Sequence, residues 1–138
     1  MVLDIPKLLE VNKSGGCLKL YGDEAKGLFV VEPHGLINPA LIKIDLLEAE
    51  KFGAMQSKPW IYLVDTSNVT FPNPLNLLFL RKIKHLPNLG QYVIYAPSAA
   101  VQVLGKITNF IIKPDIVLKD KEEYKGFVNT TLKRTIPQ

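Results

Sequence analysis

Residues 58–86 read KPWIYLVDTSNVTFPNPLNLLFLRKIKHL, and this stretch decides the fold that we predict. Its residues 60–64 are a continuous apolar run rich in aromatic and β-branched side chains, which predicts a strand covered on both faces. The short polar side chains of residues 65–68 bond readily to nearby backbone and predict a loop. Asn73 and Pro74 then predict the cap and the first position of a helix. A strand, a loop and a helix in this order form one β-α unit.

The predicted helix from Pro74 to Leu86 is apolar on more than one side. The stripe expected to pack against the sheet consists of Leu75, Leu78, Phe79, Ile83 and Leu86. Leu77 projects nearly opposite this stripe, and Leu80 projects toward its flank beside Arg81. Two interpretations fit: these are ordinary exposed leucines, or they bind a partner.

Toward the N-terminus, residues 1–16 show no sustained period, and we expect a leading segment before the sheet begins. Residues 17–21 and 27–32 each predict a strand, and the turn between them predicts an antiparallel pair. A proline and a glycine within residues 33–35 predict the end of the second strand. An asparagine and a proline at residues 38–39 predict a helix that continues to about residue 52 or 55.

Toward the C-terminus, residues 91–96 predict the next strand, and Ser98 predicts the cap of a further helix. Residues 116–118 predict a short last strand. Asp120, with Glu123 three residues later, predicts a capped start to the final helix. The buried face of that helix is expected to consist of Tyr124, Phe127, Val128 and Leu132.

Strands alternate with helices, so we predict a single α/β domain over residues 17–134, with residues 135–138 frayed. The expected sheet is mostly parallel, with about five strands, an antiparallel N-terminal pair and about four helices.

At 138 residues, 47% of them hydrophobic, the chain can bury a sizeable core. We see no signal peptide and no run long enough to span a bilayer. Cys17 is the single cysteine, which agrees with a reducing compartment, so a cytoplasmic location is expected. The net charge of +4 comes from scattered residues, and without a nucleic-acid motif we expect no nucleic-acid partner.

The motifs of common catalytic and metal sites are missing. The chain contains no glycine-rich phosphate motif, no HExxH, no CxxC and no GxSxG elbow. We therefore expect no enzyme activity, no cofactor and no metal site.

Polar side chains gather where predicted strands end and helices begin. In an open α/β sheet these ends share one edge, so Asp65, Ser67 and Ser98 are expected to lie near one crevice. Free N–H groups of helix starts there could hold an anion. The same residues could instead serve only as caps and turns.

The segments VDTSNVTF, YVIYAPS and IVLKDKEEY, each followed or preceded by a helix in the predicted order, resemble a STAS domain of the SpoIIAA-like type, the fold of anti-sigma-factor antagonists. The resemblance covers residues 17–133. Where the antagonists carry a regulatory phosphoserine motif, this chain has Phe71-Pro72-Asn73-Pro74, so that motif is missing.

The resemblance implies a non-enzymatic regulatory module that binds another protein, or a second copy of itself. The surface it implies consists of Thr66, Ser67, Asn73, Asn76, Leu77, Leu80 and Arg81. The alternative is a small-molecule or lipid-binding module that uses the crevice near Asp65, Ser67 and Ser98.

Overall fold

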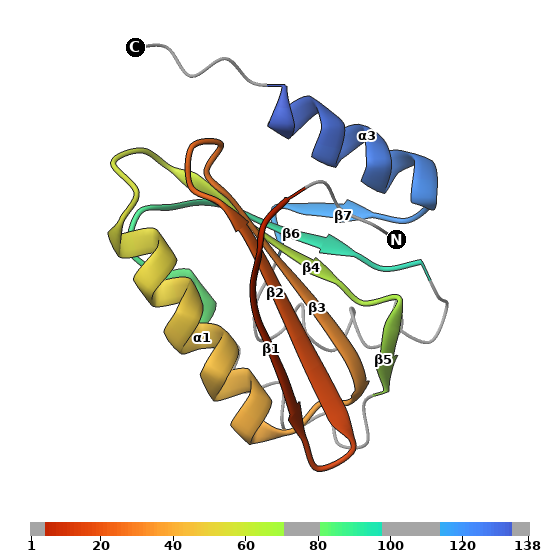
Figure 1. Ribbon diagram of the computed structural model, residues 1–138. Helices are drawn as coiled ribbons and strands as arrows, with labels where there is room; N and C mark the ends of the chain where they lie inside the picture. The colour runs from red at the N-terminus through yellow and green to blue at the C-terminus, as the bar shows by residue number, and fades with distance from the viewer. Residues whose placement is uncertain (1–4, 71–80, 98–113, 134–138) are drawn as a thin grey trace.

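The computed structural model describes residues 5–70, 81–97 and 114–133. Its strands are β1 (Lys7–Lys13), β2 (Gly16–Asp23), β3 (Leu28–Leu36), β4 (Trp60–Asp65), β5 (Asn68–Thr70), β6 (Leu89–Tyr95) and β7 (Ile116–Leu118). They form one seven-stranded sheet in the order β1-β2-β3-β4-β6-β7, with β5 beside β3. Helices α1 (Pro39–Ala54) and α3 (Lys121–Leu132) cover opposite faces of this sheet (Figure 1).

The sheet changes direction at β3. Strands β1, β2 and β3 pair antiparallel, whereas β3 with β4, β4 with β6, and β6 with β7 pair parallel. The predicted α/β class, the mostly parallel sheet and the antiparallel N-terminal pair are confirmed. The prediction of about five strands was too low, because the described residues contain seven.

The first missed strand is β1, which lies where a leading segment was expected. It pairs with β2 through a two-residue loop, Ser14-Gly15, in which both residues have positive φ, 50° and 83°. This is the backbone of a type I′ hairpin turn, whose twist matches that of the flanking strands. Residues 7–13 are mostly exposed, so tertiary pairing rather than hydrophobic alternation makes them a strand.

Three other boundaries differ from the prediction. Strand β3 continues through residues 33–35, where we expected it to end, and the predicted polar loop contains the short strand β5. Strand β6 begins at Leu89, before the predicted start at residue 91. In each case pairing with a neighbouring strand outweighs local turn residues.

The two predicted helix caps that lie among the described residues, Asn38 and Asp120, are present. The Asn38 side chain accepts a hydrogen bond from the Leu41 N–H at the start of α1, and Asp120 accepts one from the Glu123 N–H at the start of α3. About four helices were expected, and the described residues contain two. The helix predicted after Ser98 and residues 71–80 lie outside the described residues. Residues 81–85 form a 3₁₀ turn.

Strand β4 is the central strand, as predicted, and both of its faces are covered. Trp60 and Tyr62 join the core beneath α1, whereas Ile61 and Leu63 join the core beneath α3. Beneath α1 the rings of Phe29 and Phe52 lie 5.3 Å apart, and Phe52 meets Trp60 edge-on at 5.3 Å. Burial on both faces explains the continuous apolar run of the sequence.

The α1 core contains one buried carboxyl group. Asp45 is 4% exposed, and its Oδ2 accepts a hydrogen bond from the Tyr62 hydroxyl, whereas its Oδ1 has no partner. Burial raises the pKa of Asp45 to about 7, although the Tyr62 hydrogen bond lowers it. The folded protein therefore holds a proton on Asp45 that the unfolded chain releases at lower pH.

The raised pKa of Asp45 predicts a loss of stability as pH rises. This contribution is complete below the ordinary aspartate pKa and is lost as pH rises through about 7. Urea unfolding between roughly pH 5 and pH 8 should show wild type losing stability relative to Asp45→Asn, whose amide oxygen can still accept from Tyr62. Parallel pH profiles for the two proteins would contradict this account.

Replacing two helical glycines with alanine should have opposite effects on the free energy of unfolding. A Cβ at Gly53, in the last turn of α1, would lie 2.5 Å from the Pro87 carbonyl oxygen, whereas a Cβ at Gly126 in α3 meets nothing within 4 Å. Gly126→Ala should raise the free energy of unfolding by about 0.5–1 kcal/mol through helix propensity. Gly53→Ala should lower it. Calorimetry tests both, and stabilisation by Gly53→Ala would refute the close packing.

Candidate functional site

The carboxyl end of β4 contains a bulge. Val31 of β3 pairs with Val64, and His34 pairs with Asn68 of β5. Between these pairs β3 advances three residues while the facing chain advances four. The extra residue lies in the segment Thr66-Ser67, so β4 and β5 run beside β3 as one strand interrupted by a bulge. Bulges are common beside functional sites because they redirect side chains.

Pro33 lies on β3 where its neighbour changes from β4 to β5. A proline has no N–H and is tolerated in a sheet where the ladder is interrupted. On the other side of the bulge, Thr66 bonds to β6 instead: its N–H and its hydroxyl both donate to the Tyr95 carbonyl, at 3.0 and 2.6 Å. The bulge is therefore fixed by hydrogen bonds to β6.

Ser67 follows the buried Thr66 and is exposed. Its N–H and its hydroxyl both donate to Asp65 Oδ1, at 3.0 and 2.6 Å. This is the local side-chain-to-backbone bonding expected of an aspartate at a turn. The predicted residues Asp65 and Ser67 thus do lie together, in direct contact.

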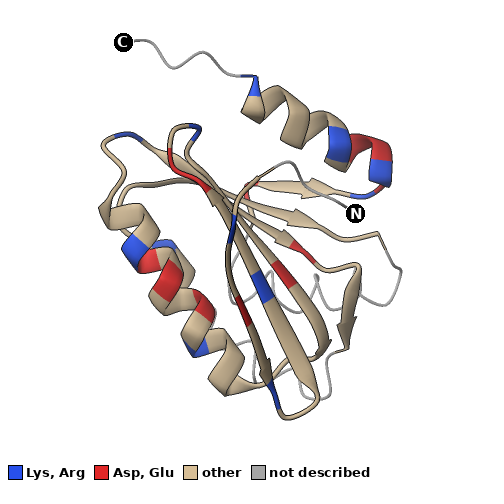
Figure 2. Ribbon diagram, in the orientation of Figure 1, with Lys and Arg blue, Asp and Glu red and all other residues tan. Residues whose placement is uncertain are grey.

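A row of charged and polar residues crosses the α3 face of the sheet at this level. Cross-strand pairing places Glu10 of β1 opposite Lys19 of β2, and Lys19 opposite Glu32 of β3. Glu32 and Asp65 follow the paired residues 31 and 64, so their side chains leave neighbouring parallel strands on the same face. Acidic bands on β1, β3 and β4 and a basic band on β2 follow this row in Figure 2.

Glu32 and Asp65 form what we call the carboxylate pair. They are 6% and 4% exposed. Each uses one oxygen on an outer neighbour: Glu32 Oε1 lies 2.7 Å from His34 Nε2, and Asp65 Oδ1 accepts from Ser67. Among the described residues, no other hydrogen bond of ordinary length reaches either carboxylate, although the Tyr124 side chain also interacts with Asp65.

Tyr124 of α3 lies over the carboxylate pair. Its side chain is fully buried, and its hydroxyl makes no hydrogen bond of ordinary length. Burial, then the negative charges of Asp65 and Glu32, and then a hydrogen-bonding interaction with Asp65 raise the pKa of Tyr124. Its ring lies 4.3 Å from that of Tyr95, the register partner of Asp65. The Tyr124 hydroxyl therefore lies close enough to Asp65 to interact with its carboxylate.

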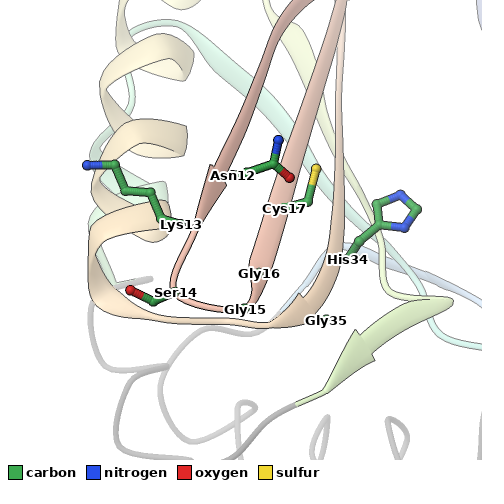
Figure 3. A pocket seen from close by; sticks show the side chains of 8 residues that line it. All are labelled: Asn12, Lys13, Ser14, Gly15, Gly16, Cys17, His34 and Gly35. Carbon is green, nitrogen blue, oxygen red and sulfur yellow. The ribbon is translucent and has the colours of Figure 1, made fainter.

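A shallow pocket of about 440 Å³ adjoins the carboxylate pair at His34. We call it the hairpin pocket; Asn12, Lys13, Ser14, Gly15, Gly16, Cys17, His34 and Gly35 line it (Figure 3). Cys17 and His34 are register partners, and in Figure 3 Lys13 extends away from both. Within the described chain no hydrogen bond joins the Cys17 thiol to His34, whose Nε2 is bonded to Glu32. The pocket therefore lacks a cysteine–histidine dyad.

Of the remaining predicted site residues, the structure describes Arg81 but not the others. Arg81 is exposed at the start of residues 81–85. Ser98, Asn73, Asn76, Leu77 and Leu80 lie outside the described residues. The sequence analysis missed Glu32, His34 and Tyr124. The signal for the first two is the alternation that continues from the buried positions 28 and 30, placing positions 32 and 34 on the same face.

No protein-family model matches this chain, and no curated protein sequence matches it. Among the described ranges, no helix has both the length and the apolar character to cross a membrane. In the same ranges, no three His, Cys, Asp or Glu side chains converge so that they could hold a metal ion.

The hydrogen bonds of the bulge predict that removing its two hydroxyl groups lowers the free energy of unfolding by different amounts. Thr66→Val removes a buried hydroxyl bond to Tyr95 and should lower the free energy of unfolding by about 1 kcal/mol. Ser67→Ala should cost less, because Ser67 is exposed and its N–H still reaches Asp65. Urea denaturation measures both. An equal or larger cost for Ser67→Ala would contradict the assigned roles.

Proposed function

We propose that this chain is a non-enzymatic regulatory module that binds another protein at the carboxyl edge of its parallel strands. The observation that supports this best is the bulge at Thr66-Ser67, which is fixed from within yet exposes Ser67 and Asn68. A surface held in one conformation loses little entropy when it binds. The resemblance to STAS domains points to the same surface, and we place the module in the cytoplasm on the argument from its single cysteine.

The bonding of Ser67 favours recognition over hydrolysis. A serine nucleophile needs a general base that accepts its proton, most often a histidine. The Ser67 hydroxyl donates to Asp65, and His34 is bonded to Glu32 instead. A regulatory phosphorylation switch is not part of the proposal, because the phosphoserine motif of the antagonists is missing.

A second candidate function is the binding of a small ligand at the same edge. The observation that favours it is the carboxylate pair, two buried acidic side chains that lie beneath Tyr124 near the end of β4. Buried charged groups are usually paired, so these carboxylates could accept hydrogen bonds from a ligand. The acidic character of these residues favours a cation over the anion suggested by helix starts.

If a protein partner binds this surface, replacing two of its leucines with aspartate should weaken binding. Leu77→Asp with Leu80→Asp should reduce partner recovery or self-association at least about tenfold, because apolar anchors carry most of the energy of such interfaces. Light scattering measures self-association, and quantitative mass spectrometry of pull-downs from the native host measures partner recovery.

Leu47→Asp is the matched control, since Leu47 is 54% exposed on α1, away from the proposed surface. It should leave binding unchanged. Circular dichroism confirms that each variant folds. Equal binding by the folded double variant and by wild type would refute the proposed surface.

A further inference from the structure

Polar side chains hold helix α1 against the sheet at its start, its middle and its end. At the start, the Asn38 amide donates to the carbonyl of the last residue of β1, at 3.1 Å. At the end, the Asn88 amide, just before β6, donates to the Gly53 carbonyl at 3.3 Å. In the middle, the Tyr62 hydroxyl of β4 donates to Asp45. The middle contact is the one that contains a carboxyl group.

This middle contact, at Asp45, lies at the centre of the buried face of α1. Leu41 and Ile42 lie one turn before it and Ala49 one turn after it, at 1%, 4% and 0% exposure. Residues three and four apart on a helix share one face, so these neighbours enclose the carboxyl group between the helix and the sheet. Its Oδ1 has no hydrogen-bond partner and is shielded from solvent. Water therefore reaches Asp45 only when α1 moves away from the sheet.

No charge among the described residues compensates an ionised Asp45. The groups that face it are two tyrosines: Tyr62 of β4 donates to it, and Tyr92 of β6 is close enough for its charge to raise the Tyr92 pKa. Lys19 and Glu32, on β2 and β3, leave the sheet on the α3 face. Burial and the Tyr62 hydrogen bond alone set the pKa of Asp45. A buried carboxylate without a paired charge is costly.

We propose that the buried contact between Asp45 and Tyr62 is a proton-dependent latch on α1. With a proton on Asp45, α1 lies closed on the aromatic core of the sheet. Without that proton, α1 lifts from the sheet so that water reaches the carboxylate. Helix α3 stays closed, because the core beneath it is a separate cluster on the opposite face. The latch does not depend on which partner or ligand the chain binds.

The direction of the pH dependence follows from the two states of α1. In the open state the pKa of Asp45 has its ordinary value of 3.8, whereas in the closed state burial raises the pKa to about 7. Between these values the closed state binds more protons than the open state. The equilibrium constant for opening should therefore rise about tenfold per pH unit from roughly pH 4 to roughly pH 7, and it should level off above that.

Amide hydrogen exchange of the full chain tests the latch, because exchange of a buried α1 amide requires opening. Each exchange rate is divided by the intrinsic rate at the same pH, which gives a protection factor. Peptides from residues 39–54 report on α1, and peptides from residues 121–132 report on α3. Between pH 5 and pH 7 the protection of α1 should fall about fiftyfold, whereas the protection of α3 should stay constant.

Three variants separate the latch from other effects of pH. Asp45→Asn keeps an oxygen for the Tyr62 hydrogen bond and cannot ionise, so its α1 protection should not change with pH. Tyr62→Phe removes the hydrogen bond that lowers the pKa of Asp45, so α1 protection should go on falling beyond pH 7. Glu48→Gln is the matched control: it removes a partly exposed carboxylate of α1, paired with Lys51 at 3.4 Å, and should keep the wild-type profile.

A fall in protection that is confined to α1 and absent from Asp45→Asn would establish the latch. Protection of α1 that stays constant with pH in wild type, or that falls equally in Asp45→Asn, would overturn it. An equal fall in α1 and α3 would overturn it as well, because the proton would then control global unfolding and not the lifting of α1.

Discussion

The constraint on which the site depends is the missing N–H of Pro33. Strand β3 pairs with β4 up to residue 31 and with β5 from residue 34, and the proline lies between. Because a proline cannot donate to a ladder, the facing strand is free to leave β3 there. It does so through the bulge at Thr66-Ser67, which bonds to β6. The end of β4 and the exposed Ser67 follow from this interruption.

The fold positions this interruption because β3 connects the two halves of the sheet. On one side it belongs to an antiparallel three-stranded unit, and on the other it begins the parallel series. The carboxyl ends of parallel strands are where open α/β sheets bind their ligands. A strand that pairs on both sides and continues past its parallel neighbour brings its own side chains, Glu32 and His34, to that edge. Those side chains are what distinguish this edge from a set of caps and turns.

Local patterns in the sequence were enough to predict the central strand and the helix of residues 39–54. A continuous apolar run and an asparagine before a proline act through short-range physics. Strands β1 and β5 were missed because their residues are mostly exposed and become strands only by pairing. Asp65 and Ser67 could be predicted because they directly follow the central strand. Tyr124 was predicted only as a core residue, since nothing in a sequence tells whether a buried hydroxyl has a partner.

The two faces of the sheet bury carboxyl groups in different ways. Asp45 lies under α1, bonded to Tyr62 within an aromatic core, and its unpartnered oxygen is fully buried. Protonation removes the charge that burial disfavours there, and burial accordingly raises the pKa of Asp45 to about 7. Glu32 and Asp65 lie at the end of a strand, with the exposed Ser67 and the half-buried His34 on their outer side. Each of these carboxylates therefore keeps a polar partner at the edge of the sheet, His34 or Ser67, whereas Asp45 has only the Tyr62 hydroxyl inside the core.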